Sequence, residues 1–313
     1  MTNDAPTVSV VIPSYNCERF IAETLESVVG QSYGDLEVIV VDDGSTDGTP
    51  EVVRRFAPRV RLVQQESAGV CAARNRGIAE ARGRYVALLD HDDYWFPDKL
   101  GAQVDVLDSH PEVGVVFTAF LSWEADSQGV FPSPMTFDRK PYGEGPEPEY
   151  SGWIYHLFLL DCWMLTSTAM FRAEVFRRCG VFDLSLPYSE DWDLWLRIAR
   201  EYPFVKLRQP GTLYRQHASQ GNRKVRDRDF RTELLSEAVL KWGLCSPDGS
   251  CLDDRTFRRQ LAKYHTDFAL GHAIAGNRGV ALRSLARALR TNPQGLKALT
   301  YMAAVAVGWR PRW

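Results

Sequence analysis

The chain reads Leu88-Leu89-Asp90-His91-Asp92-Asp93-Tyr94-Trp95 where an apolar run, residues 85–89, stops at three carboxylates. This pattern indicates the carboxyl end of a buried strand. In an open α/β sheet the ligand lies outside the carboxyl ends of the strands, so the acids are expected at the mouth of a site. Closely spaced carboxylates repel one another unless a cation lies between them. Mg²⁺ or Mn²⁺ takes one or two carboxylates and fills its shell with water and phosphate oxygens, so the motif predicts a metal-bridged phosphate ligand.

The same residues have a simpler interpretation as a solvated acidic turn. Asp92 or Asp93 would then cap the helix that Pro97 opens, because turns and caps favour aspartate. A single Asp-x-Asp pair is too short to distinguish the two interpretations, so the rest of the chain has to be considered.

The chain on either side of this motif alternates between strand and helix patterns. Strands are expected at residues 8–12, 36–41, 60–63, 85–89 and 113–117, and helices at about 18–29, 49–56, 69–82 and 97–107. β-branched runs mark the strands, and apolar residues three or four apart mark the helices. This alternation predicts an α/β fold with a mostly parallel, Rossmann-like sheet that is doubly wound and flanked by helices.

Composition limits the possible classes of protein. With 313 residues, 45% hydrophobic residues and a net charge of -3, the chain is expected to form a soluble globular protein and not to bind nucleic acid as its main partner. Six scattered cysteines form no Cys-x-x-Cys pair, so neither a zinc site nor secretion is indicated, and a cytoplasmic location is expected. No signal peptide and no membrane-spanning run of apolar residues is recognisable.

A second expected strand is also followed by acidic residues. Asp42 and Asp43 follow residues 36–41 as Asp90 follows its own strand, and parallel strands bring their carboxyl ends to one edge. Asp43 could accept a hydrogen bond from a nucleobase or a ribose hydroxyl, although a turn residue ahead of Gly44 would look the same. Neither common glycine-rich phosphate loop occurs, so a metal and side chains would have to hold any phosphate charge.

Four short motifs stand in order along the first third of the chain. They are Val10-Val11-Ile12-Pro13-Ser14-Tyr15-Asn16, Val40-Val41-Asp42-Asp43-Gly44-Ser45-Thr46-Asp47-Gly48-Thr49, Ala73-Arg74-Asn75-Arg76-Gly77 and Leu89-Asp90-His91-Asp92-Asp93. Together they resemble the family 2 glycosyltransferases, which have the nucleotide-diphospho-sugar (GT-A) fold. The resemblance covers about residues 7–220 and implies inverting transfer of a sugar from a nucleotide donor to an acceptor hydroxyl.

The resemblance also implies roles for individual residues. Donor-nucleotide contacts are implied for Pro13, Tyr15, Asp43, Arg74, Asn75, Asp90 and His91. Asp90 and Asp92 would form the Asp-x-Asp site for Mn²⁺ or Mg²⁺. For Arg74, a position on the polar face of the helix at 69–82 is an equally good interpretation.

A second acidic motif, Ser189-Glu190-Asp191, precedes a tryptophan-bearing helix. Glu190 and Asp191 fall in its first turn, where acids favour the helix dipole without doing any chemistry. Inverting sugar transfer, however, needs a base that takes the proton of the acceptor hydroxyl. The resemblance implies that Asp191 is this base and that Glu190 orients the acceptor.

Further downstream, a strand pattern at residues 211–217 ends in Gln216 and His217. A neutral histidine is a good ligand for Mn²⁺ and a good donor to phosphate. The family often has such a residue near the diphosphate, so His217 is a candidate metal ligand; an ordinary surface histidine is the alternative.

Two segments stand apart from the α/β pattern. Residues 124–150 hold five prolines and little periodicity, which predicts a loop or hairpin insertion that shapes the acceptor pocket or is simply flexible surface. We therefore expect a catalytic domain at 1–222 and a helical C-terminal region at 223–313. The apolar segment 296–309, with tryptophan and basic residues around it, suits peripheral contact with a membrane; core packing or a homodimer contact are the alternatives.

The expected function is that of an inverting, metal-dependent glycosyltransferase in the synthesis of cell-surface polysaccharide or glycolipid. Its partners would be a nucleotide-diphospho-sugar and a glycan or lipid-linked acceptor, in the cytoplasm or at the inner face of the membrane. A non-catalytic sugar-nucleotide or glycan-binding protein is one alternative. A sugar nucleotidyltransferase is another, although Pro13-Ser14-Tyr15-Asn16 is not the glycine-rich basic loop expected of one.

Overall fold

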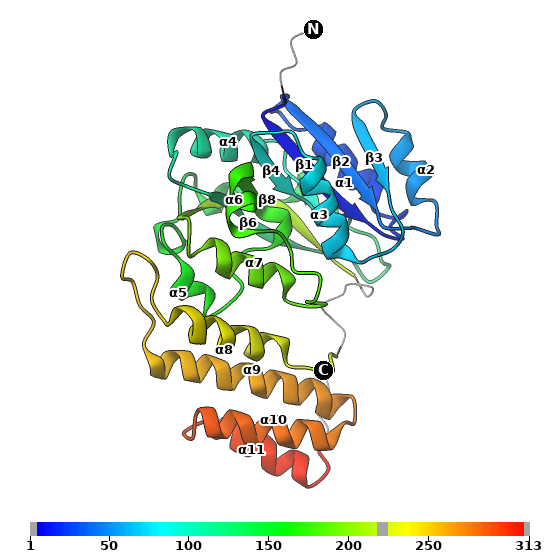
Figure 1. The fold of residues 1–313 in the computed structure, drawn as a ribbon. Helices are drawn as coiled ribbons and strands as arrows, with labels where there is room; N and C mark the ends of the chain where they lie inside the picture. The colour runs from blue at the N-terminus through cyan, green and yellow to red at the C-terminus, as the bar shows by residue number, and fades with distance from the viewer. Residues whose placement is uncertain (1–4, 218–224, 310–313) are drawn as a thin grey trace. The chain divides into compact units, whose positions relative to one another are not determined.

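The computed structural model describes residues 5–217 and 225–309 (Figure 1). These residues form two compact units, one of residues 5–154 and 162–217 and the other of residues 155–161 and 225–309. The boundary predicted at residue 222 lies outside the described residues. The short segment 155–161 belongs to the second unit, although the sequence suggested that it would belong to the first.

The first unit contains an eight-stranded sheet in the order β3-β2-β1-β4-β7-β6-β8-β5. The strands are β1 (Val8–Ser14), β2 (Leu36–Asp42), β3 (Val60–Gln64), β4 (Tyr85–Leu88), β5 (Tyr94–Trp95), β6 (Val115–Glu124), β7 (Ala169–Arg172) and β8 (Phe204–Gln216). Strands β1 to β4 are parallel to one another, and β6 is parallel to β8. Strand β7 runs antiparallel to both β4 and β6, and strand β5 runs antiparallel to β8. The predicted α/β sheet is confirmed, and it is mixed because β5 and β7 run antiparallel to their neighbours.

Helices and short 3₁₀ turns complete the first unit. The helices are α1 (Ile21–Val29), α2 (Thr49–Arg54), α3 (Val70–Glu80), α4 (Lys99–Ser109), α6 (Ala173–Cys179) and α7 (Glu190–Ile198). The 3₁₀ turns are η1 (Pro134–Thr136), η2 (Lys140–Tyr142), η3 (Pro148–Tyr150) and η4 (Thr166–Thr168). The first three of these turns lie in the predicted insertion, where Phe131 packs against Phe20 and Trp123.

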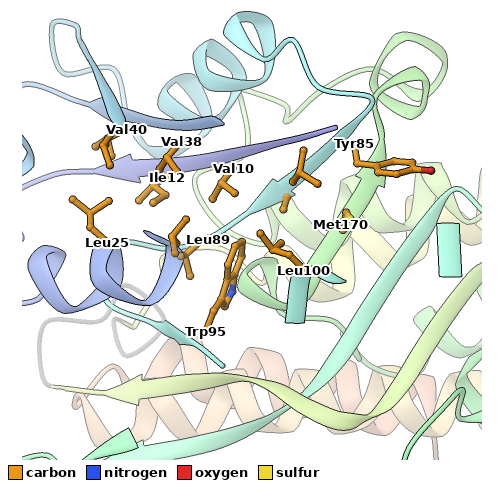
Figure 2. Close-up of a cluster of buried hydrophobic side chains, with 14 of the residues drawn as sticks. Val10, Ile12, Leu25, Val38, Val40, Tyr85, Leu89, Trp95, Leu100 and Met170 are labelled. Carbon is orange, nitrogen blue, oxygen red and sulfur yellow. The ribbon is translucent and has the colours of Figure 1, made fainter. Parts of the chain in front are cut away.

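The core of the first unit is built around the central strand β1, all seven residues of which are buried. Val10 and Ile12 lie in one apolar cluster with Leu25 of α1 (Figure 2). Val11, the residue between them, approaches Gly77 of α3, where an added Cβ would lie 2.2 Å from Val11 Cγ1. Glycine at this position therefore lets α3 lie close against the sheet.

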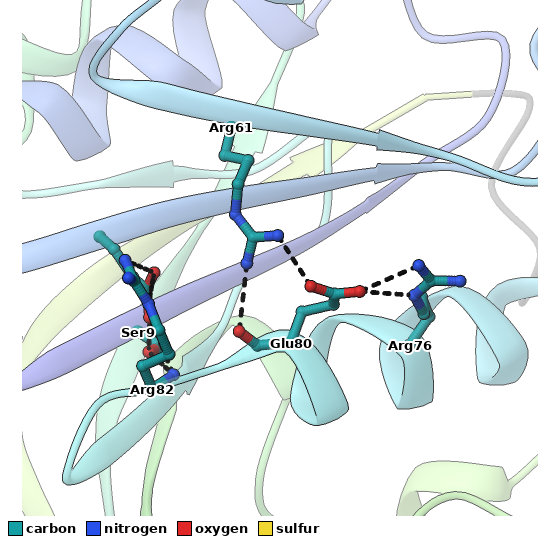
Figure 3. Close-up of polar contacts among 6 residues, drawn as sticks. Ser9, Arg61, Arg76, Glu80 and Arg82 are labelled. Atoms are coloured by element: carbon teal, nitrogen blue, oxygen red, sulfur yellow. Dashed lines mark hydrogen bonds and ion pairs between the residues drawn. The ribbon is translucent and has the colours of Figure 1, made fainter. Parts of the chain in front are cut away.

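Ion pairs hold the C-terminal end of α3. Glu80 accepts hydrogen bonds from Arg61 of β3 at 2.8 Å and from Arg76, one turn earlier, at 2.9 Å (Figure 3). Exposed pairs of this kind contribute little stability each. Together with the packing at Gly77, they position the last turns of α3 against the sheet.

The second unit is helical, as predicted for the C-terminal region. It consists of α5 (Tyr155–Phe158), α8 (Phe230–Trp242), α9 (Asp254–Ile274), α10 (Arg278–Thr291) and α11 (Leu296–Ala306). Cys245 and Cys251, between α8 and α9, form a disulfide that the scattered cysteines did not suggest. None of the helices in the described ranges has the length and hydropathy needed to cross a bilayer.

Candidate active site

The carboxyl ends of β1, β2 and β4 meet at one edge of the sheet. Ser14 at the end of β1 pairs with Asp42 at the end of β2, and β4 runs beside β1 in the same direction. Asp43 and Asp90 follow the ends of β2 and β4. The acids that the sequence predicted at two strand ends therefore do lie at the same edge.

Asp43 is buried, and each oxygen of its carboxylate accepts two hydrogen bonds. Its Oδ1 accepts from Gln65 Nε2 at 2.7 Å and from the Ala68 N–H at 2.9 Å. Its Oδ2 accepts from the Gly69 N–H at 2.8 Å and from Ser67 Oγ at 3.2 Å. Two of these donors are N–H groups at the start of α3, where the helix dipole favours negative charge. Asp43 thus holds the loop that begins α3; its contact with a nucleotide stays a prediction.

Arg74 of α3 joins the two acidic motifs. Its Nη2 donates to Asp90 Oδ1 at 2.7 Å, and its Nη1 donates to Glu190 Oε1 at 3.0 Å. The side chain is only 6% exposed, and the guanidinium lies 5.1 Å from the centre of the Phe182 ring. Burial lowers the pKa of Arg74, but the Asp90 and Glu190 carboxylates outweigh this effect and raise it, so the group stays charged.

The next residue, Asn75, ties α3 to the segment that leads to α7. Its Nδ2 donates to the carbonyl of Phe182 at 2.8 Å, and its Oδ1 accepts from the N–H of Phe182 at 3.0 Å. The amide is therefore engaged with the backbone, and its predicted contact with the nucleotide stays a prediction. Through these two neighbouring residues, α3 positions both acidic motifs.

Helix α7 presents Glu190 and Asp191 at its first turn. The residue before them, Ser189, is buried and has φ 61° and ψ 22°, a left-handed conformation that costs a non-glycine residue roughly 1 kcal/mol or more. Trp192 and Trp195 are buried on the inner face of the helix. The packing of these rings holds Ser189 in its strained backbone conformation. Strain of this kind concentrates at functional sites.

Asp191 has the electrostatic properties of a base. Burial raises the pKa of its carboxyl group to about 7, and the neighbouring Glu190 carboxylate adds to this effect, whereas Arg74 opposes it. The Trp192 N–H donates to Asp191 Oδ1 at 2.7 Å. A carboxylate with a pKa near 7 accepts a proton far more readily than an ordinary aspartate.

The two other predicted metal ligands also lie together. His217 Nε2 and Asp92 Oδ2 are 2.7 Å apart, and each side chain is 14% exposed. Burial raises the pKa of Asp92, but the hydrogen bond with His217 and the charges of His91 and His217 outweigh it and lower the pKa below its usual value. The His217 ring packs against Phe20, with ring centres 4.9 Å apart.

The remaining predicted donor-site residues line the same strand edge. His91 Nδ1 lies 3.1 Å from the carbonyl oxygen of Pro13, which joins the end of β1 to the acidic motif. Tyr15, two residues further on, is 48% exposed and is therefore accessible to a ligand. Contacts of these residues with a nucleotide stay predictions.

Two residues that the sequence did not single out support the acidic motif. Arg215 is 1% exposed; its Nε donates to the Asp92 carbonyl at 2.6 Å, and its backbone N–H donates to Asp93 Oδ1 at 3.0 Å. Ser167 Oγ accepts from the Asp90 N–H at 3.1 Å and donates to Asp93 Oδ2 at 2.5 Å. For Arg215 the sequence did hold a signal, because an arginine within an apolar strand pattern is a buried charge that needs partners. Nothing in the sequence around Ser167 gave a comparable signal.

The donor set fits a divalent cation that is bound together with a phosphate ligand. Within residues 5–217 and 225–309, no three acidic, histidine or cysteine side chains lie together as a complete ligand set. Mg²⁺ and Mn²⁺ at nucleotide sites take only one or two carboxylates, and water and phosphate oxygens fill the other positions. The ionised Asp92 beside His217, with Asp90 two residues away, supplies ligands of that kind.

Comparisons with known proteins agree with this arrangement. Residues 9–156 match the model of glycosyl transferase family 2. A UDP-Glc:alpha-D-GlcNAc-diphosphoundecaprenol beta-1,3-glucosyltransferase of Escherichia coli, WfaP, is 31% identical over 241 residues, which are 75% of this chain and 85% of that protein. An uncharacterized glycosyltransferase of Rickettsia felis is 29% identical over 238 residues, 75% of this chain and 38% of that protein. The chain spans 34% to 59% of the length of the Rickettsia relatives it matches.

Solved structures have the same fold. Residues 1–349 of TarS from S. aureus, in complex with UDP-GlcNAc, are 19% identical with a TM-score of 0.65, and the match covers 96% of this chain and 88% of that one. The mannosyltransferase PcManGT from Pyrobaculum calidifontis, in complex with GDP-Man and Mn²⁺, is 25% identical with a TM-score of 0.55, and the match covers 97% of this chain and 81% of that one.

Proposed function

The chain belongs to the family 2 glycosyltransferases, and from that premise we propose that it transfers a sugar, with inversion, from a nucleotide-diphospho-sugar to an acceptor hydroxyl. The observation that carries the proposal is the contact of Arg74 with both Asp90 and Glu190. This contact links the Asp90-His91-Asp92 motif to the Glu190-Asp191 motif, which supports the assignment of both to one site. A sugar held by its diphosphate at the first motif would then be within reach of the second.

We assign the acceptor side to the first turn of α7. Asp191 takes the proton from the acceptor hydroxyl as its oxygen attacks the anomeric carbon, and Glu190, held by Arg74, orients the acceptor. The raised pKa of Asp191 supports the assignment, because a base must retain the proton through the bond-forming step. Attack from the face opposite the leaving diphosphate inverts the anomeric centre.

We assign the donor side to the strand edge. Pro13, Tyr15 and His91 would lie along the nucleotide, and Asp43 would act by shaping the loop before α3. Asp92, Asp90 and His217 would hold Mn²⁺ or Mg²⁺, which supplies Lewis-acid stabilisation of the leaving diphosphate when it is bound. Arg215 and Ser167 fix the backbone of the acidic motif for this purpose.

The acceptor is proposed to be a glycan or a lipid-linked sugar, in the synthesis of cell-surface polysaccharide or glycolipid. WfaP, by its name, glucosylates a sugar on diphosphoundecaprenol, a lipid carrier. An acceptor of this kind is reached at the inner face of the membrane, where we expect the protein to work.

The test is release of a nucleoside diphosphate by the purified protein. A panel of UDP-, GDP-, dTDP- and CDP-sugars, each with Mn²⁺ or Mg²⁺, is incubated with lipid-diphosphate sugar acceptors, and both nucleotide and product are measured. We expect one donor to be consumed and Asp191→Asn to abolish transfer while donor binding is retained. Donor binding without turnover on any acceptor would instead favour a sugar-nucleotide-binding protein.

A further inference from the structure

The charge of the chain is distributed very unevenly. Residues 278–313 contain seven basic residues and no acidic residue, whereas the preceding 277 residues contain 30 basic and 40 acidic ones, a net charge of -10. The overall charge of -3 thus conceals a segment of +7. A charge of that size attracts the segment to an anionic surface.

Three of these charges form a stripe on one face of α10. Arg283, Arg287 and Arg290 are all exposed, and their spacing of four and three residues places them on the same side of the helix. We call them the basic stripe. The other side of α10 carries Leu285 and Ala288, which are fully buried in the core of the second unit. The ion pairs described within this unit involve other basic residues.

The neighbouring helix α11 is apolar on two sides. Ala298 and Val305 are buried in the helical core. Leu296, Leu299, Ala303 and Val307 are exposed and follow one another at spacings of three, four and four residues, so they line another side. We call these four residues the apolar stripe.

The exposure of this stripe is large for apolar side chains. Leu296 is 77% exposed, Leu299 55% and Val307 86%. Just beyond the helix, Trp309 stacks on Tyr301 with ring centres 5.9 Å apart and remains partly exposed. An exposed row of apolar side chains favours an apolar surface, and tryptophan beside basic residues is typical of the membrane interface.

We propose that helices α10 and α11 bind the surface of an anionic lipid bilayer, with the basic stripe against lipid phosphates and the apolar stripe in the interfacial layer. Helix α11 has 11 residues, about half the length needed to span a bilayer, so it would lie in the surface. An acidic protein would pair with the arginines but would leave the apolar stripe in water. Two copies meeting through these helices would bring two segments of charge +7 together. An anionic bilayer offers both the phosphates that the basic stripe would pair with and the apolar layer that the apolar stripe would enter, and the proposal is independent of the catalytic function.

The test is co-sedimentation of the whole chain with lipid vesicles in the absence of any substrate. Vesicles of phosphatidylcholine alone are compared with vesicles in which part of the lipid is phosphatidylglycerol, at low and at high salt. We expect binding only to the anionic vesicles, and weaker binding at high salt. Replacing the basic stripe by Arg283→Gln, Arg287→Gln and Arg290→Gln should weaken binding roughly 100-fold, because each basic residue at such a surface contributes about a factor of five.

Matched controls separate this effect from a general loss of charge or of fold. Arg54→Gln, Arg55→Gln and Arg59→Gln remove three exposed arginines from the first unit and should leave vesicle binding unchanged. Leu296→Ser with Leu299→Ser should weaken binding, whereas Leu240→Ser, at an 89% exposed position on α8, should not. Circular dichroism shows whether each variant is folded.

Three outcomes would overturn the proposal. The first is the absence of binding to anionic vesicles at low salt. The second is equal binding by the basic-stripe variant and its arginine control. The third is self-association that the basic-stripe variant loses, seen by light scattering without any vesicle binding, which would identify a second copy of the chain as the occupant.

Discussion

Asp90 and Glu190, one hundred positions apart in the sequence, accept hydrogen bonds from the two terminal nitrogens of a single guanidinium, that of Arg74. One carboxylate follows a strand of the sheet and the other begins a helix. The shared cation attracts an acid from each motif, offsets part of their negative charge and so allows the two to approach one another. Without it, the site would concentrate negative charge before any metal or substrate arrived.

Replacing Arg74 should therefore damage both stability and activity. Arg74→Ala leaves two partly buried carboxylates unpaired, and we expect a loss of about 3 kcal/mol in the free energy of unfolding, the lower end for breaking a buried pair. Arg76→Ala, two residues further along α3 and in an exposed i,i+4 pair with Glu80, should cost less than about 0.5 kcal/mol. Urea denaturation of the two variants measures the difference, and equal costs would contradict the structural role of Arg74.

The rate of transfer should depend on the ionisation of Asp191. Its pKa is raised to about 7, and only the deprotonated form can accept a proton, so kcat/KM should fall as the pH drops below about 7. Burial raises this pKa most, the Glu190 and Asp90 carboxylates raise it further, and Arg74 lowers it, so Glu190→Gln should move the midpoint to lower pH. A profile that is flat from pH 5 to 8 would remove the assignment of the base; Asp193→Asn, in the same helix, should leave the midpoint in place.

The raised pKa of Asp191 should make the stability of the fold decrease with rising pH, whereas the rate of transfer should increase. A carboxyl group whose pKa is higher in the folded state than in the unfolded state destabilises the fold as the pH rises, progressively from its unfolded value of 3.8 up to about 7. Asp191→Asn should therefore raise the melting temperature at pH 8 and change it little at pH 4. Scanning calorimetry at the two pH values measures this difference. A melting temperature that falls at pH 8 would show that the ionised group is stabilising.

Asp43 should act through the loop that begins α3. Asp43→Asn replaces one acceptor oxygen by an NH₂ group that faces two donors, so we expect a loss of about 1–3 kcal/mol, typical of unsatisfied buried groups, together with weaker donor binding. Asp35→Asn, at an exposed acceptor for Thr7, is the control and should cost less. Isothermal titration with the donor and thermal melting give the two readouts. Unchanged donor affinity in a destabilised Asp43→Asn protein would show that the loop before α3 does not contribute to donor binding.

His217 and Asp92 should affect metal-dependent binding specifically. His217→Ala and Asp92→Ala should each weaken donor binding in the presence of Mn²⁺ by roughly 10-fold or more, and should change metal-free binding much less. His110→Ala, which removes an exposed histidine at the C-terminal end of α4, is the control. Titration with and without Mn²⁺ measures the effect. Equal losses in both conditions would show that the pair supports the fold and not a metal.

The sequence was most informative where the physics is local. The apolar runs of β1, β2 and β4 and the helical spacing of α3 predicted these elements to within a few residues, because burial on both faces of a central strand leaves few polar positions. The acids after β2 and β4 followed from the same reasoning, since parallel strands end at a common edge.

The contacts made across long separations could not be predicted in this way. Nothing in the sequence around Asn75 indicates that its amide pairs with Phe182, which is 107 residues away. The bond between Cys245 and Cys251 depends on the turn between α8 and α9, and a six-residue spacing alone does not reveal it. Segment 155–161 belongs to the second unit because its side chains pack with the later helices.

Under the proposed function, the guanidinium that spans the two motifs would also set a sequence of events. A cation bound by Asp90 would draw that carboxylate away from Arg74, whose charge would then act mainly on Glu190 and Asp191. The pKa of Asp191 would fall, so loading of the donor would itself prepare Asp191 to receive a proton. Kinetics with a compulsory order, donor first and acceptor second, would then arise from a single side chain without any moving lid.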